Sequence, residues 1–305
     1  QAAANTKVED FIRQRFDRQV ELNGTTNMDD GTQLTVQIII KPKTPEIRIN
    51  FGNTPLSPGN FNATSGIVHA AVFYVLRLLL DEEIPLNEGL LHCVPIDIPS
   101  NSLLNPKEQP DFRPAVAAGN VETSQQLVDL LLSAFGVMAN SQGTMNNFLF
   151  GSETTANDSS SQGSYYETIG GGMGATAAGP GASAVQSHMT NTRLTDPEVL
   201  EARFPIRLVC HSRRSNSGGA GQFRGGDGVI REYQFLAPQT VSLITSRRTT
   251  APQGLAGGKP GASGANLLIA ADGRHETLPA VITLTVKPGD RIRLATPGGG
   301  GYGRG

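Results

Sequence analysis

The sequence predicts an α+β fold, with a mixed N-terminal half built on two long core helices and a mostly β C-terminal half with glycine-rich turns. Two apolar segments of helical length lie before residue 139. After residue 164, short β-like runs alternate with glycine. Of the 36 glycines in the 305 residues, 25 lie between residues 170 and 305, so the two halves differ in composition as well as in pattern.

The N-terminal half begins with a polar segment, 5–18, that has helical character. Residues 32–41 and 46–51 are rich in β-formers, and the "KPKTPE" between them predicts a turn. The apolar run 66–80 carries His69 and Arg77 and is shorter than the roughly 20 residues that a membrane span needs. It therefore predicts a buried core helix.

The second long helix is expected over 124–138. Thr123 and Gln126 fit a capping box at its start. Six apolar residues share one helical face, which predicts packing against the core: Leu127, Leu130, Leu131, Ala134, Phe135 and Met138.

The hydrophilic "SETTANDSSSQGS" predicts a surface loop over 152–164, which separates an α+β part, 1–151, from a β-rich part, 165–305. Strands are expected in the later part at "IRLVC", "GVIREYQFL", "TVSLITS", "ANLLIA", "AVITLTV" and "RIRLAT". A short helix begins at Asp196, because "TDPEVLE" places aspartate at the N-cap, proline at the first helical position and glutamate in the first turn.

Bulk composition limits the class of protein. The net charge of −2 gives no electrostatic case for binding nucleic acid. Only two cysteines, Cys93 and Cys210, favour a reducing, cytoplasmic compartment over a secreted disulfide framework. The first residues, "QAAANTKVED", lack the apolar core of a signal peptide, and we expect the chain to be part of a longer one.

Short nucleotide and metal motifs fit poorly. "GGGMGA" is followed by "TAAGPGAS", which cannot begin the helix that a dinucleotide fingerprint requires. "GLAGGKPG" is too short for a phosphate loop and has proline where Ser or Thr would hold magnesium. His92–Cys93 and Cys210–His211 are adjacent pairs, and neighbours on a strand point to opposite faces, so neither pair can readily bind one metal.

The polar stretch "SHMTNTRLTDPEVLEARFP", 187–205, holds the candidate catalytic histidine. His188 lies beside glycine-rich sequence without strand or helix periodicity, so it is a candidate general acid or base. Two interpretations of the glycine runs remain open at this point. Their amides could bind an anion, helped by Arg213, Arg214 and Arg224, or the glycines could form tight turns between strands.

Several longer motifs occur one after another along the chain. They are "GNVETSQQLVD", "SQGTMNNFLFG", "YYETIGGGMGA", "HMTNTRLTDPEVLEARFP", "SGGAGQFRGGDGVIRE" and "TPGGGGYG". From about Asn27 to its end, the chain resembles the hydantoinase B/oxoprolinase family, and within it the C-terminal part of the B-type half of ATP-dependent 5-oxoprolinases.

The resemblance implies a hydrolase that opens 5-oxo-L-proline to L-glutamate, a step of glutathione metabolism, with hydrolysis of ATP. It implies that ATP with Mg is bound by an A-type half outside this sequence, in the same chain or as a subunit. Family members carry a metal-binding Asp/His cluster, with an H-x-x-x-H-like run, in their N-terminal segment. That run does not occur here, so no metal ligand is carried over, a divalent metal is expected only upstream, and the chain alone is expected to be inactive.

The resemblance also suggests a substrate cavity wall. Glu167 and His188 are the candidate catalytic residues, and Gly171, Gly172, Asn191 and Arg193 are the candidate substrate-binding residues. Glycine amides could approach an oxyanion, the arginine could hold the substrate carboxylate, and the histidine could relay a proton.

Other interpretations remain open. The B-type half of an ATP-dependent hydantoinase or N-methylhydantoinase acts on a similar ring, and acetone carboxylase is a weaker choice. A non-catalytic docking module for an ATP-binding partner is the alternative outside the enzymes. No nucleic-acid or membrane partner is expected. The protein is expected to form a homo-oligomer.

Overall fold

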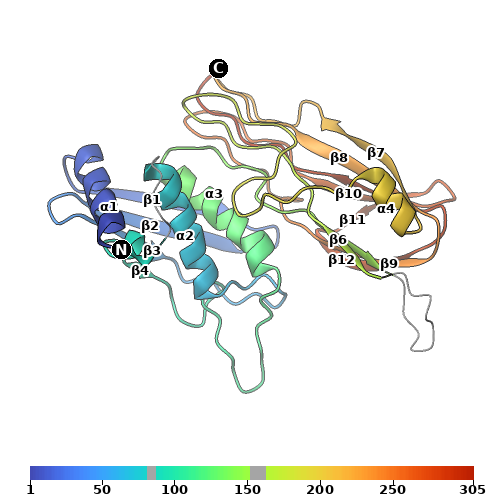
Figure 1. Ribbon diagram of the computed structural model, residues 1–305, viewed down its shortest axis with the longest axis horizontal. Helices are drawn as coiled ribbons and strands as arrows, with labels where there is room; N and C mark the ends of the chain where they lie inside the picture. Colours follow the sequence, from blue (N-terminus) through green and yellow to red (C-terminus); the bar gives the residue numbers. More distant parts are fainter. Residues whose placement is uncertain (81–86, 152–162) are drawn as a thin grey trace. The chain divides into compact units, whose positions relative to one another are not determined.

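A computed structural model describes residues 1–80, 87–151 and 163–305 (Figure 1). Its four α-helices and thirteen strands, within these described ranges, confirm the predicted α+β class. The chain divides into two compact units, Gln1–Val137 and Met138–Gly305. The expected boundaries 1–151 and 165–305 remain a prediction, and most of the expected loop, 152–164, lies outside the described residues.

The first unit is a sheet covered by helices. Its strand order is β1-β2-β3-β4, antiparallel except for the parallel pairing of β3 with β4. The strands are β1 (Val20–Asn27), β2 (Gln33–Lys41), β3 (Glu46–Phe51) and β4 (Ile96–Asp97). The helices are α1 (Ala2–Arg15), α2 (Ser65–Leu80) and α3 (Ser124–Ala134), with the shorter turns η1 (Glu88–Leu91) and η2 (Gly119–Thr123).

Alternation along β2 and β3 decides which face of this sheet is buried. Alternate β2 residues from Leu34 to Ile40 are buried, as are Ile47, Ile49 and Phe51 of β3. Successive side chains of a strand point to opposite faces, so these residues form one apolar face. Helices α1 and α3 pack against the sheet and α2 packs against α3 (Figure 1), so α2 is a core helix as predicted.

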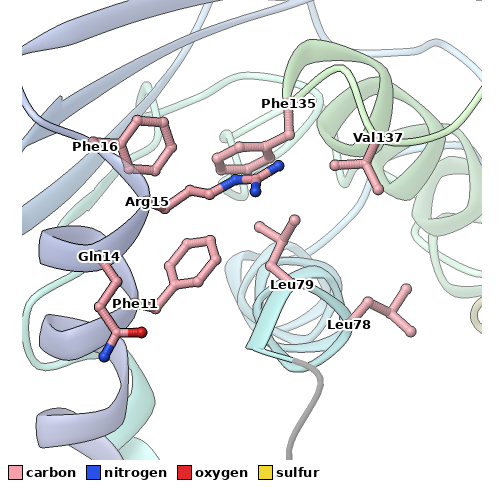
Figure 2. Close-up of a pocket in the computed structure, with 8 residues that line it drawn as sticks. All are labelled: Phe11, Gln14, Arg15, Phe16, Leu78, Leu79, Phe135 and Val137. Atoms are coloured by element: carbon pink, nitrogen blue, oxygen red, sulfur yellow. The ribbon is translucent and has the colours of Figure 1, made fainter. Parts of the chain in front are cut away.

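A shallow pocket of about 530 Å³ lies where the ends of α1 and α2 approach the residues after α3 (Figure 2). Apolar side chains of α1, of α2 and of the residues just after α3 dominate its lining, among them Phe11, Leu79 and Phe135. None of the residues predicted to act on substrate lies in this pocket.

The start of α3 differs from the predicted capping box. Thr123 has helical backbone angles and makes no side-chain cap, and its hydroxyl instead donates to the Phe61 carbonyl at 2.5 Å. The π-helical turn η2 runs directly into α3, so the Ser124 amide at the start of α3 already donates to the Gly119 carbonyl. The helix ends at Ala134, before the predicted 138, because Gly136 adopts a left-handed φ of 72° and Val137 donates back to the Leu132 carbonyl.

The second unit contains a β-sandwich. One sheet has the order β11-β10-β13-β8-β7 and the other β12-β9-β5-β6. The strands are β5 (Asn147–Gly151), β6 (Tyr165–Glu167), β7 (Ile206–Arg214), β8 (Gly228–Phe235), β9 (Gln239–Ile244), β10 (Ala265–Ile269), β11 (His275–Leu278), β12 (Val281–Val286) and β13 (Arg291–Ala295). Buried side chains from both sheets form one core, in which the Phe148 and Tyr233 rings stack with centroids 4.2 Å apart.

Helix α4 (Pro197–Arg203) confirms the predicted cap. The Asp196 carboxylate accepts from the amides of Glu198 at 2.9 Å and Val199 at 3.4 Å. None of the helices in the described ranges combines the length and apolar character that a membrane span requires.

The glycine runs of the second unit pack backbone against backbone. The Gly226 amide donates to the Met173 carbonyl at 2.8 Å, and the Gly226 carbonyl accepts from Gly299 at 2.9 Å. A Cβ on Gly226 would lie 1.8 Å from the Ala182 carbonyl oxygen, and one on Gly299 would lie 2.0 Å from that of Met173. Side chains would prevent this packing, so close approach of main chains explains the local glycine content.

Candidate functional site

Glu167 ends β6, the edge strand of its sheet, and its side chain lies in the sandwich interior. Its carboxylate accepts from Arg231 Nε at 2.9 Å and Nη2 at 3.2 Å, and from the Tyr165 hydroxyl at 2.8 Å. The side chains of Glu167 and Arg231 are 4% and 1% exposed. Burial raises the pKa of Glu167 and the Arg231 charge opposes that rise. The carboxylate is therefore half of an internal ion pair.

The next residue, Thr168, ties the candidate loop to this strand. Its hydroxyl forms a short hydrogen bond with the Thr192 hydroxyl. Gln186 Nε2 donates to the Thr168 carbonyl at 3.1 Å and to its hydroxyl at 3.0 Å. Gln186 and Thr192 flank His188, so both ends of the His188 loop are fastened to the residue that follows Glu167.

The predicted loop residues differ in exposure. His188 is half-buried and has a left-handed backbone with φ 55°, which is uncommon for a residue with a side chain. Asn191 and Arg193 are exposed. The structure thus places this loop beside Thr168, whereas Glu167 contacts core residues. Roles in substrate binding or proton transfer remain predictions for all three loop residues.

Gly171 and Gly172 have engaged amides. Gly171 donates to the Val185 carbonyl and Gly172 to that of Pro297, both at 2.9 Å. In this structure neither N–H is available for the expected oxyanion contact, because each already has a backbone acceptor. Gly171 instead permits a close approach, since a Cβ there would lie 2.1 Å from Gln142 Oε1.

The three arginines considered for anion binding are bound to protein groups. Arg224 and Arg213 face the buried Asp227 carboxylate at 2.8 and 3.6 Å. Arg214 donates to the carbonyls of Ser263 at 2.7 Å and Thr296 at 3.0 Å. Burial raises the pKa of Asp227, but the Gly218 amide and the arginines outweigh it and leave that pKa lowered. This geometry does not favour anion binding by these arginines. Beyond the expected tight turns between strands, the glycine runs pack main chain against main chain.

A polar cluster lies where β5 begins and β9 ends, and it consists of the buried amides of Gln142, Asn146 and Asn266 and the half-buried Arg248. Arg248 donates from Nη2 to Asn146 Oδ1 at 2.9 Å and from Nε to Asn266 Oδ1 at 3.0 Å. Asn146 Nδ2 in turn donates to Gln142 Oε1 at 2.9 Å.

The residues of this cluster were not among those predicted from the sequence. Polar runs at the ends of two apolar strands, "SQGTMNN" and "SRR", were the available signal. The antiparallel pairing of β5 with β9 brings these two runs together, and that pairing is a property of the sheet.

The glycine-rich run 254–261 and the His, Cys, Asp and Glu side chains of the described residues are the candidates for a phosphate site and a metal site. In the run 254–261 the amides of Leu255, Lys259 and Gly261 donate to the carbonyls of Gly301, Ala220 and Pro252, so they do not form a phosphate cradle. Across residues 1–80, 87–151 and 163–305, no three His, Cys, Asp or Glu side chains come together. The run 254–261 therefore does not fit the phosphates of ATP, and the described residues offer a metal no cluster of three such side chains.

Two solved structures have a fold similar to that of this chain. The structure of an ATP-dependent caprolactamase from Pseudomonas jessenii superposes with a TM-score of 0.81 at 26% identity, covering 99% of this chain and 54% of that one. A nucleotide-free acetone carboxylase superposes with a TM-score of 0.80 at 15% identity, covering 98% of this chain and 47% of that one, and shows the fold alone. The chain therefore has the fold of about half of each of these two proteins.

The family model for hydantoinase B/oxoprolinase matches residues 1–305, and the chain belongs to this family. It is 43% identical over 303 residues to 5-oxoprolinase 1 of Arabidopsis thaliana, covering 99% of this chain and 23% of that protein. It is 41% identical over 325 residues to 5-oxoprolinase of Saccharomyces cerevisiae, covering 99% and 25%. The chain thus spans about a quarter of the length of these relatives.

Proposed function

We propose that this chain is part of the B-type half of an ATP-dependent 5-oxoprolinase, which hydrolyses 5-oxo-L-proline to L-glutamate. One observation carries the proposal: identity above 40% extends over 99% of the chain to proteins named 5-oxoprolinase. The caprolactamase structure adds support, because caprolactam is also a cyclic amide.

The chemistry explains why such an enzyme needs ATP. An unstrained lactam is a poor electrophile, and phosphorylation of its amide oxygen creates a leaving group and a carbon that water can attack. In this proposal an A-type half, in the same chain or as a separate subunit, holds ATP with Mg, and any divalent metal is held upstream of the present residues. The present chain contributes the wall around the ring.

The proposal assigns a role to each candidate residue. The His188 loop, fastened to Thr168, carries the proton relay, and Arg193, which is exposed, holds the substrate carboxylate with Asn191 beside it. Gly171 and Gly172 form the adjoining wall. Glu167 acts as a positioning residue, since its ion pair with Arg231 fixes β6 and with it the start of the loop.

The direct test is His188→Ala in the complete enzyme, with the exposed His275→Ala as matched control. Loss of an acid–base group reduces the rate about 10²–10⁴-fold. We expect a fall of that size in kcat for ATP-coupled ring opening, and an unchanged rate in the control. Wild-type kcat in His188→Ala, or turnover of 5-oxoproline by the 305-residue chain alone, would contradict the assignment.

A hydantoin substrate is the second candidate. The chain is 28% identical over 299 residues to a protein from Pseudomonas sp. whose name assigns it to a D-/L-hydantoinase, covering 94% of this chain and 47% of that protein. Comparing kcat/KM of the complete enzyme on 5-oxoproline and on hydantoin decides between the two. A docking module without catalysis would leave both rates unchanged when His188 is replaced.

The cellular setting is part of the same proposal. A cytoplasmic enzyme of glutathione metabolism agrees with the two unpaired cysteines, Cys93 and Cys210. A homo-oligomer is proposed as well, and light scattering of the complete enzyme measures it.

A further inference from the structure

The amide nitrogen of Gln142 is a buried donor that lacks an acceptor. Gln142 is fully buried, and Nε2 has no hydrogen-bond partner among the described residues. A buried donor left unsatisfied costs about 1–3 kcal/mol, so its persistence calls for an explanation. The side chain is otherwise well held, because Oε1 accepts from Asn146 and the backbone amide donates to the Gly172 carbonyl.

The orientation of the Gln142 amide is fixed by its neighbours. Arg248 can only donate, so the Asn146 atom that faces it must be the oxygen. Asn146 Nδ2 then points to Gln142 and also donates to the Ile169 carbonyl at 3.0 Å. Gln142 must therefore present its oxygen to Asn146, which directs the NH2 group elsewhere. The chain of donors removes the usual ambiguity between amide oxygen and nitrogen.

The surrounding backbone holds this group rigidly. Asn146 has a left-handed φ of 49°, and the Thr144 hydroxyl accepts from the amides of both Asn146 and Ser246. Gly171 lies directly against the Gln142 side chain. Left-handed residues other than glycine cost free energy and are retained where the surroundings require them, often at functional sites.

We propose that the Gln142 carboxamide donates a hydrogen bond to the acyl oxygen of a cyclic amide substrate. The inference rests on the proposed function and extends it. The sequence predicted an oxyanion contact from the Gly171 amide, and we assign that contact instead to the Gln142 side chain, which packs against Gly171. A fixed donor in a water-poor site stabilises developing charge without reorganisation. The acceptor is an oxygen of carbonyl type, which matches the donor-only character of the NH2 group.

Two variants of the complete enzyme test this inference. Gln142→Glu keeps an acceptor for Asn146 but replaces the NH2 group by an oxygen that repels an acyl oxygen. Gln142→Met keeps the length of the side chain and removes both polar atoms. Gln253→Glu makes the same chemical change at an exposed position and is the control. Steady-state kinetics on 5-oxoproline and hydantoin are measured with the melting temperature of each variant.

We expect kcat/KM to fall about 10²–10³-fold in both Gln142 variants, on whichever ring the wild type opens. The melting temperature of Gln142→Met stays near that of the wild type, because Asn146 Nδ2 retains the Ile169 carbonyl. Unchanged kcat/KM in both variants, or unfolding of Gln142→Met, would show a donor satisfied by water or a purely structural side chain and would overturn the inference.

Failure of the proposed function gives a different result. A wild-type enzyme that opens neither ring contradicts the proposed function, and calorimetric binding of both rings then tests Gln142. If Gln142→Met weakens binding of a ring at least about tenfold, which is about 1.4 kcal/mol, Gln142 donates a hydrogen bond to that ring even though the enzyme does not open it. Equal binding in wild type and variant, or no binding at all, overturns it.

Discussion

Two buried regions of the second unit are held together in opposite ways. The sandwich core consists of large side chains, with Phe148 stacked on Tyr233 and Phe150 against the edge of Phe235. The glycine-packed region consists of main chains whose amides and carbonyls bond to one another. Side chains fill space that can relax after a truncation, whereas touching main chains leave no room for even one added carbon. Burial alone therefore does not predict which substitutions a region tolerates.

The largest expected effect comes from adding one carbon to the glycine-packed region. Gly226→Ala places a Cβ 1.8 Å from the Ala182 carbonyl oxygen, and backbone atoms on both sides cannot move aside independently. We expect a loss of more than about 4 kcal/mol in the free energy of unfolding, measured by urea titration. Gly179→Ala is the control, because no atom lies within 4 Å of its added Cβ. Equal midpoints for the two variants would refute the backbone-packing account.

The second largest loss of stability is expected when the buried ion pair between Glu167 and Arg231 is broken. This pair joins the sandwich core to the strand that precedes the His188 loop. Arg231→Met leaves the Glu167 carboxylate buried without its cation, which costs about 3–5 kcal/mol. The double variant Glu167→Gln with Arg231→Met removes both charges and is expected to recover part of that loss. Thermal unfolding of the single and double variants measures the coupling. If the double variant is no more stable than Arg231→Met alone, the Glu167 and Arg231 charges do not stabilise each other.

The smallest expected effect concerns Asp227 and depends on pH. Its pKa is lowered in the folded protein from 3.8, so folding favours the carboxylate. The stabilisation is present above pH 3.8 and is lost as the pH falls through the folded pKa. Asp227→Asn should cost about 1–2 kcal/mol at neutral pH and less in acid. Urea titrations at a series of pH values test this, and a difference that is independent of pH contradicts it.

Much of the fold was accessible from local pattern. The alternation of β2 and β3, the apolar α2 and the cap at Asp196 are set by residues close in sequence, and each was predicted. Strands β1, β4, β5, β6 and β11 were missed. β1 is polar on its exposed face, β6 has three residues at a sheet edge, and both are strands because a partner supplies their hydrogen bonds.

The candidate site was also predicted only in part. The motif sequence indicated the His188 loop, but not that Thr168 fastens it or that Glu167 turns inward to Arg231. Glu167 is the last residue of β6 and turns into the core, whereas Thr168 directly after the strand bonds to Gln186 and Thr192.

The sequence by itself determined the α+β class, the helix cap and the family, because these depend on local periodicity and on motifs read along the chain. Only the tertiary structure decided what the glycines do and where Gln142 points. Those outcomes depend on contacts between Gly226 and Ala182, or between Arg248 and Asn146, that are many residues apart. Main-chain proximity and the direction of a hydrogen-bond chain are properties of assembled strands, and no local pattern encodes them.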